Sequence, residues 1–164
     1  MAHKLDEAIA LFDELATECR DAGDAHNLAR TLHGHAHVLM EKYEFARALA
    51  LMQEAEHVAR NAPDPLIEML SRNLVAENLR FLGDPARAAE ISAECLIFAR
   101  RHLGDDFDAL PRFILTKALT DIGRFDEAHT CIHGLLVRTH AVQGAFKGVY
   151  FQIFDAFARN ASAA

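Results

Sequence analysis

The feature that most constrains the fold of this chain is an internal repeat of forty residues. The segment from Phe45 to Arg60 returns as Pro85 to Arg100, with Ala-Arg-Ala after its first residue and Ala-Arg at its end. Weaker copies open at Leu5 and Phe125. The copies share one alanine column: Ala8, Ala48, Ala88 and Ala128. A period of roughly 20–50 residues is typical of solenoids, in which each unit stacks on its neighbours.

Each repeat is predicted to contain two helices. The segments above are the second helices, and the first helices carry small residues at Ala36, Ala76 and Thr116, with a leucine three residues later in each case. Both kinds of segment have helical spacing. Gly83-Asp84-Pro85 supplies a glycine after one helix and an N-cap and first-turn proline for the next. The predicted helices span 4–22, 25–41, 45–61, 66–82, 85–102, 106–122, 125–141 and 145–159.

The sequence therefore predicts one all-α domain over residues 1–164, an α-solenoid of antiparallel helix pairs with about eight helices. Half-repeats are expected at both ends of the chain. The full repeats run over about 25–64, 65–104 and 105–144. Small residues in fixed columns let neighbouring helices approach closely, so leucine in place of Ala48 or Ala88 should overpack the seam between them.

The repeat resembles the tetratricopeptide repeat, in which the second helix follows a Gly-Asp turn and begins with an aromatic residue and Asp-Glu-Ala. Gly123 to Ala128 and Leu82 to Ala88 match this pattern. The longer repeat is similar to those of bacterial signalling and regulatory proteins. The resemblance implies a non-enzymatic, tetratricopeptide-like superhelix that binds a partner protein or peptide in a concave groove formed by the first helices. A self-assembly module, or a regulatory or sensory segment beside a cyclase, kinase or transcription-factor output domain, is the alternative.

The groove is expected on the side of the first helices that lies opposite their apolar seam, which in 25–41 comprises Leu28, Leu32, Ala36 and Leu39. Steps of forty residues give the matching positions, which should line one exposed surface. The candidate binding residues are Arg30, His33, His37, Asn73, Glu77, Arg80, Leu110, Phe113 and Lys117. Three cations against one carboxylate make a net +2 here, which suggests an acidic or carboxylate-bearing ligand. A merely solvated helix face is the alternative.

Composition excludes several classes of function. The net charge is −7 and no basic stripe is present, so we expect no nucleic-acid partner. No apolar run reaches the roughly 18 residues of a membrane span, and no secretory signal is visible, so a cytoplasmic protein is expected. The three cysteines form no CxxC pair and are interpreted as small buried residues.

Neither metal binding nor catalysis is expected. His33 and His37 share a helix face one turn apart, as do His129 and His133, but neither pair encloses the glutamate of an HExxH motif or has a cysteine at ligand spacing. No metal or other cofactor is therefore predicted. The chain also has no nucleophile elbow, P-loop or dinucleotide-binding glycine pattern, so it is not expected to be an enzyme.

The last predicted helix, 145–159, is apolar on every side. Its candidate self-association residues are Phe146, Tyr150, Phe151, Phe154 and Phe157. A helix of this kind is normally covered all round, so it predicts a symmetric homodimer through the C-terminal helix. In the alternative interpretation, a downstream helix of a longer parent chain covers the same face.

Overall fold

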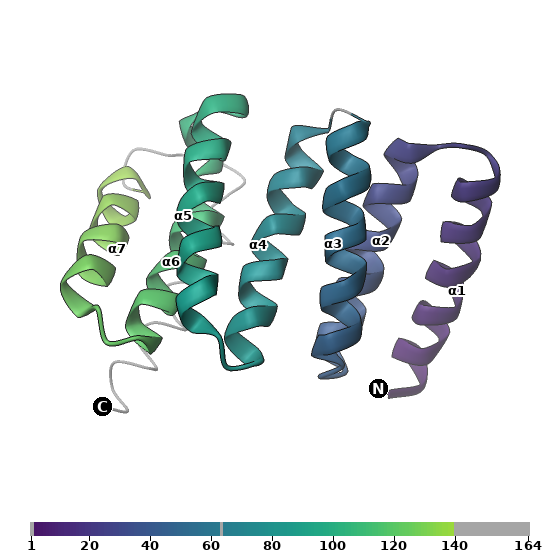
Figure 1. The fold of residues 1–164 in the computed structure, drawn as a ribbon, viewed down its shortest axis with the longest axis horizontal. Helices are drawn as coiled ribbons and strands as arrows, with labels where there is room; N and C mark the ends of the chain where they lie inside the picture. Colours follow the sequence, from purple (N-terminus) through teal and green to yellow (C-terminus); the bar gives the residue numbers. More distant parts are fainter. Residues whose placement is uncertain (1, 63, 140–164) are drawn as a thin grey trace.

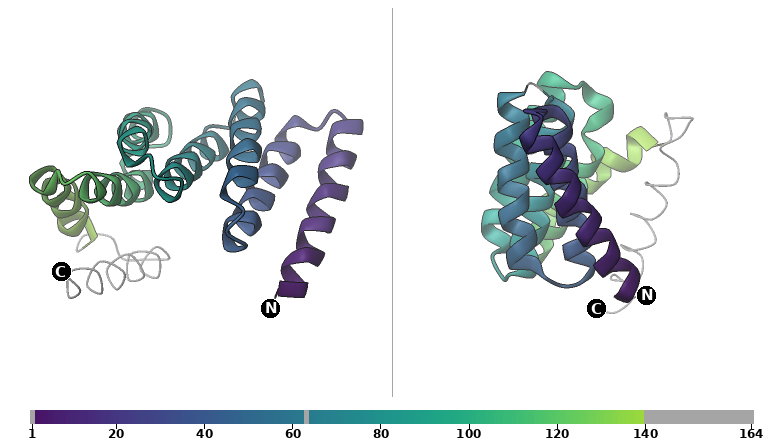
Figure 2. Two further views of the ribbon diagram at one scale, coloured as in Figure 1. Left: turned by 60° about the horizontal axis from the view of Figure 1, so that its bottom comes forward. Right: turned by 90° about the vertical axis from the view of Figure 1, so that its right-hand side faces the viewer.

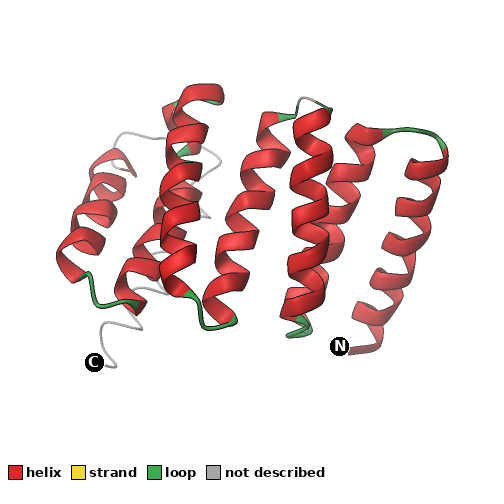
Figure 3. Cartoon of the chain, viewed as in Figure 1, coloured by secondary structure: helices red, strands yellow, loops and turns green. Residues whose placement is uncertain are grey.

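The computed structural model describes residues 2–62 and 64–139, and these residues form helices and short turns without a strand (Figure 3). The order of the helices is α1 (Ala2–Asp21), α2 (Ala25–Glu41), α3 (Phe45–Asn61), α4 (Pro65–Phe81), α5 (Pro85–His102), the 3-10 turn η1 (Asp105–Phe107), α6 (Ala109–Asp121) and α7 (Phe125–Thr139). The predicted all-helical solenoid is confirmed. The eighth predicted helix, 145–159, lies outside the described residues.

One predicted boundary is wrong. The sequence predicted a helix from 106, whereas η1 comes first and α6 begins at Ala109. A proline has no N–H and disrupts the ladder of hydrogen bonds in a helix interior. Starting at Ala109 places Pro111 in the first turn, where the N–H would have no helical partner in any case.

Aspartates and glycines define the other boundaries. Asp24, Asp64 and Asp84 cap α2, α4 and α5, and each side chain accepts a hydrogen bond from the backbone N–H three residues later, at 3.0–3.1 Å. Gly83 and Gly123 have positive φ just after α4 and α6, where a side chain would be strained. These local signals explain why the sequence placed the joints correctly.

Consecutive helices pack side by side along the whole row (Figure 1). The first helices α2, α4 and α6 form one layer, and they also contact one another directly. The second helices α3 and α5 lie in the other layer (Figure 1). Figure 2 shows the row from two further directions, with α1 and α7 at its opposite ends. The three first helices therefore present a continuous surface that crosses three repeats.

Small residues fill the seam as predicted. Ala48 and Ala88 are 0% exposed, and so are Ala36 and Ala76 in the first helices. Ala36 and Ala48 lie in one apolar cluster with Leu39 and Met52. Ala76 and Ala88 lie in another with Ile114 and Leu119. Close packing of this kind leaves no room for an added methylene group without a shift of the backbone.

The second helices share an apolar column at steps of forty residues, Leu11, Leu51, Ile91 and Cys131, and its burial is interrupted at α1. Leu11 is 66% exposed and Leu15 45% exposed, although Leu51 of the same column is half-buried and Cys131 is buried. The reason is positional, because no described element covers this face of α1. Among the described residues, no helix is both long and apolar enough to cross a membrane.

Candidate functional site

A cavity of about 270 Å³ opens between the three first helices. Its walls come from α2, α4 and α6, at positions that the forty-residue register makes equivalent, such as 33, 73 and 113. Equivalent positions meet because the first helices pack against each other in the same orientation. The lining residues are His33, His37, Met40, Leu70, Asn73, Leu74, Glu77, Leu110, Phe113 and Ile114.

Most of the predicted groove residues lie at this cavity. Arg80 and Lys117 do not line the cavity, but both donate hydrogen bonds to Glu77, which does line it. Arg30 is placed elsewhere, at a separate cavity of about 470 Å³ between α1 and α2. The sequence prediction did not include Leu74 and Ile114, which follow Leu70 and Leu110 by one helical turn. That spacing is the signal that could have identified them.

Asn73 of α4 is among the residues that line the cavity, and it is 0% exposed. The expectation of an exposed position is therefore wrong for Asn73. Direct contact of α4 with both α2 and α6 removes this part of the surface from solvent. Asn73 Nδ2 donates to the sulfur of Met69 at 3.0 Å, and Oδ1 has no hydrogen-bond partner within residues 2–62 and 64–139. Buried amide oxygens are nearly always paired, so this atom is an unusual feature of the site.

His33 contributes an uncharged imidazole to the wall of the cavity. Burial lowers its pKa to about 4, and the nearby positive charges of His37 and Arg30 act in the same direction. The ring of His37 lies edge-on to that of His33, with centroids 6.1 Å apart. The Nδ1 atom of His33 is buried and has no hydrogen-bond partner in the part of the chain that the structure describes. At neutral pH His33 therefore contributes polar atoms to this wall but no charge.

The carboxylate of Glu77 is balanced by its neighbours. Lys117 Nζ donates to Glu77 Oε1, and Arg80 Nη1 donates to Oε2 at 3.0 Å. Arg80 also binds Asp121 through Nε at 2.7 Å. Lys117 lies over the ring of Phe113, with Nζ 5.0 Å from its centroid. Two of the three cations that suggested an acidic ligand are thus already paired with carboxylates of the chain.

The two histidine pairs gain no third ligand from the described residues. The rings of His129 and His133 lie 6.2 Å apart, a separation close to that of His33 and His37. Within 2–62 and 64–139, no three His, Cys, Asp or Glu side chains cluster closely enough to hold a metal ion. A zinc site requires three or four ligands around the ion.

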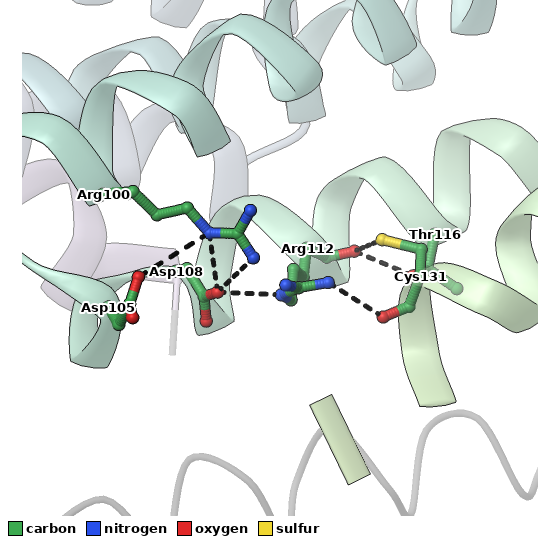
Figure 4. A network of polar contacts seen from close by, with 6 residues as sticks. All are labelled: Arg100, Asp105, Asp108, Arg112, Thr116 and Cys131. Atoms are coloured by element: carbon green, nitrogen blue, oxygen red, sulfur yellow. Dashed lines mark hydrogen bonds and ion pairs between the residues drawn. The ribbon is translucent and has the colours of Figure 1, made fainter. Parts of the chain in front are cut away.

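A second polar cluster joins α5, α6 and α7 (Figure 4). Asp108, 2% exposed, accepts hydrogen bonds from Arg100 Nη2 at 3.1 Å and from Arg112 Nε at 2.9 Å. Arg112 Nη1 donates to the backbone oxygen of Cys131 at 3.5 Å, and Cys131 Sγ donates back to that of Arg112. These contacts tie three helices together, and we interpret the cluster as structural.

Cys95 is unsuited to nucleophilic chemistry at neutral pH. All three cysteines are buried and unpaired. Burial raises the pKa of Cys95 to about 12, so its thiol stays protonated and is a poor nucleophile.

No protein-family model matches this chain, and a comparison with curated proteins found no match. Because a fold alone does not determine function, the evidence for function is the geometry of the site.

Proposed function

We propose that this chain is a non-enzymatic scaffold of the tetratricopeptide-like kind, which binds a segment of a partner protein or peptide across its first helices. The observation that carries the proposal is the cavity itself. It draws on three consecutive repeats, and six of the residues predicted from the repeat register line it: His33, His37, Asn73, Glu77, Leu110 and Phe113.

The chemistry of the cavity supports binding. Its walls are mainly apolar, with a few polar groups among them, which is the usual composition of a recognition site. Sites of this kind receive the anchor side chains that supply most of the binding energy of an interface. An extended segment lying across α2, α4 and α6 would place one such anchor in the cavity.

Partner capture from native lysate, followed by mass spectrometry, tests the proposal. The groove variant carries His37→Glu and Leu110→Glu, which put two carboxylates at the cavity. The matched control carries His57→Glu and Ile97→Glu, the same kinds of change at exposed positions of α3 and α5. We expect the groove variant to lose the captured proteins and the control to keep them. A groove variant with a native circular-dichroism spectrum that captured the same proteins would overturn the proposal.

We infer a cytoplasmic location for this scaffold. Its three cysteines are free thiols, which suits a reducing compartment, where disulfides are rare.

The homodimer remains a prediction from sequence. Its residues Phe146, Tyr150, Phe151, Phe154 and Phe157 lie outside the described residues. Sedimentation equilibrium of the wild type and of Phe154→Glu tests it, with a dimer expected for the first and a monomer for the second. A role as a regulatory segment of a larger signalling protein is compatible with either result.

A further inference from the structure

We propose that α1 and α2 together form a docking surface for the segment 145–159 of a second copy of this chain. Helix α2 packs on α3, which follows it, and α4 packs on α5 in the same way, whereas no described element takes this position before α1. The inference does not rest on the groove between α2, α4 and α6, so it goes beyond the scaffold proposed above. Its evidence is an open seam, the forty-residue register and the charges of the two surfaces.

The seam between α1 and α2 is open on one side. A cavity of about 470 Å³ lies there, and Leu15 of α1 and Arg30 of α2 are among its lining residues. Leu15 is 45% exposed, and Leu11, one turn before it, is 66% exposed. The cavity has about three times the volume of roughly 150 Å³ that holds one benzene ring, so several side chains are needed to fill it. The face of a helix supplies several side chains in a row.

The equivalent positions in the next two repeats are closed. Steps of forty residues lead from Leu15 to Ala55 in α3 and Cys95 in α5, and both of these are 0% exposed. Ala55 lies in one apolar cluster with Leu28 of α2, the first helix that precedes α3. Cys95 Sγ donates to the backbone oxygen of Met69 at 3.4 Å, and Met69 belongs to α4, the first helix that precedes α5. The cover that fits α1 is therefore another helix of the first type.

One column of the first helices fills this seam in the other repeats. Ala29 is 0% exposed and lies in an apolar cluster with Ala59 of α3. Met69, forty residues later, is 2% exposed and lies in a cluster with Cys95 of α5. Two further steps of forty residues lead from Met69 to Val149. Val149 belongs to 145–159, the predicted first helix of a fourth repeat, so this segment has an apolar residue at the position that the seam requires.

The length of the chain shows that the segment must come from another copy. Helices α1 and α7 lie at opposite ends of the row (Figure 2). Packed helices lie at least about 8 Å apart, so the three steps from α6 past α4 and α2 to the open position cover at least about 24 Å. Residues 140–144, which connect α7 to the segment, span at most about 20 Å when fully extended. The segment therefore does not reach α1 of its own chain.

The two surfaces carry opposite net charges. Helix α1 has Lys4 and Arg20 against six carboxylates, which gives −4. The segment 145–159 has Lys147 and Arg159 against Asp155, which gives +1. The whole chain carries −7, which disfavours most contacts between copies. A contact that joins surfaces of opposite sign avoids this repulsion and orients the two copies.

The proposed contact is heterologous, because the C-terminal segment of one copy meets the first two helices of the next. It differs from the symmetric dimer predicted from sequence, in which two copies of 145–159 meet each other. A heterologous contact adds copies head to tail until a ring closes or a longer chain forms. The two arrangements therefore predict different results when variants are mixed.

Two variants of the full chain test the contact by complementation. Leu15→Glu places a carboxylate in the seam between α1 and α2, and Val149→Glu places one on the segment. Circular dichroism checks that both fold, which we expect because Leu15 is partly exposed. In sedimentation equilibrium at micromolar concentration, we expect the wild type to associate. Each variant alone should associate at least about tenfold more weakly, because the contact would bury an unpaired carboxylate.

An equimolar mixture of the two variants should form a dimer that contains one copy of each. The segment of Leu15→Glu is intact and binds the intact seam of Val149→Glu, whereas the other two surfaces are both blocked. Ile97→Glu is the matched control, because Ile97 is 60% exposed on α5 and lies outside the seam. It should associate as the wild type does.

Three results would overturn the inference: a monomeric wild type, a Leu15→Glu variant that associates as strongly as the wild type, or a mixture that stays monomeric. The second of these is the result that the symmetric dimer predicts. The outcome for the scaffold is separate, because the groove variants that test partner capture change no residue of this seam. Loss of capture in those variants together with a monomeric wild type would reject the head-to-tail contact and leave the scaffold proposal standing.

Discussion

Tyr43 follows α2 with φ of 62°, a left-handed conformation that glycine adopts at the equivalent positions Gly83 and Gly123. For a residue with a side chain this conformation costs about 1–2 kcal/mol. Glycine removes this cost, but it also makes the unfolded chain more flexible, which offsets part of the gain in stability. We therefore expect Tyr43→Gly to raise the free energy of unfolding by about 0.5–1 kcal/mol, as measured by urea denaturation. Tyr43→Ala, which keeps the strain, is the control. A Tyr43→Gly protein less stable than Tyr43→Ala would contradict this account.

His33 makes the stability of the chain depend on pH. Its pKa is about 4 in the folded protein and near 6.5 when unfolded, so between these values the unfolded chain binds a proton that the folded chain does not. Stability must fall as the pH falls through this window, by up to about 2 kcal/mol at pH 5. Denaturation at pH 7 and pH 5 should show a smaller loss for His33→Gln than for the wild type.

Part of the loss should persist in that variant. Burial also lowers the pKa of His35, which acts in the same direction in spite of the neighbouring carboxylate of Asp13. An equal loss of stability in the wild type and in His33→Gln would show that His33 is not the source of the pH dependence.

At the scale of the helices, the small residues of the seam set how closely α2, α3 and α4 approach. Ala48 is 0% exposed at the centre of this contact. Ala48→Leu adds three carbon atoms where no space exists, and we expect it to lower the free energy of unfolding by about 1–3 kcal/mol. Ala50→Leu, at an exposed position of the same helix, should change it by less than about 0.5 kcal/mol. Similar losses in the two variants would contradict a packed seam.

The buried cluster at the start of α6 predicts a larger effect. Asp108→Asn removes the counter-charge of Arg100 and Arg112, and breaking a buried ion pair costs about 3–5 kcal/mol. Because Arg100 is partly exposed, we expect the lower end of this range in urea denaturation. Asp105→Asn is the control, since its carboxylate is exposed and 3.9 Å from Arg100. A loss below 1 kcal/mol for Asp108→Asn would mean that the cluster is not structural.

At the scale of the whole molecule, stability should be lower at α1 than in the middle of the row. Helix α3 lies between α2 and α4, whereas α1 packs mainly on α2 and leaves Leu11 and Leu15 exposed. In a solenoid each unit is stabilised chiefly by its neighbours. Hydrogen exchange followed by mass spectrometry should therefore show faster exchange of amides in α1 than in α3. Uniform protection across both helices would instead indicate that the row opens as one unit.

Local signals let the sequence by itself determine the helices and their order. Asp84 caps a helix through an atom of its own side chain, and Gly83 adopts a conformation open to few other residues, so both act within one turn of the chain. The forty-residue columns also placed His33, Asn73 and Phe113 around the same cavity, because equivalent helices pack in the same orientation.

Only the tertiary structure decided the chemical character of that cavity. The periodicity assigns Asn73 to a face of α4, but whether water reaches it depends on how closely α2 and α6 approach. The same holds for Glu77, whose charge is balanced by a lysine forty residues away. Helix packing distances and side-chain partners arise from all the contacts of the fold together, and a pattern along one chain does not contain them.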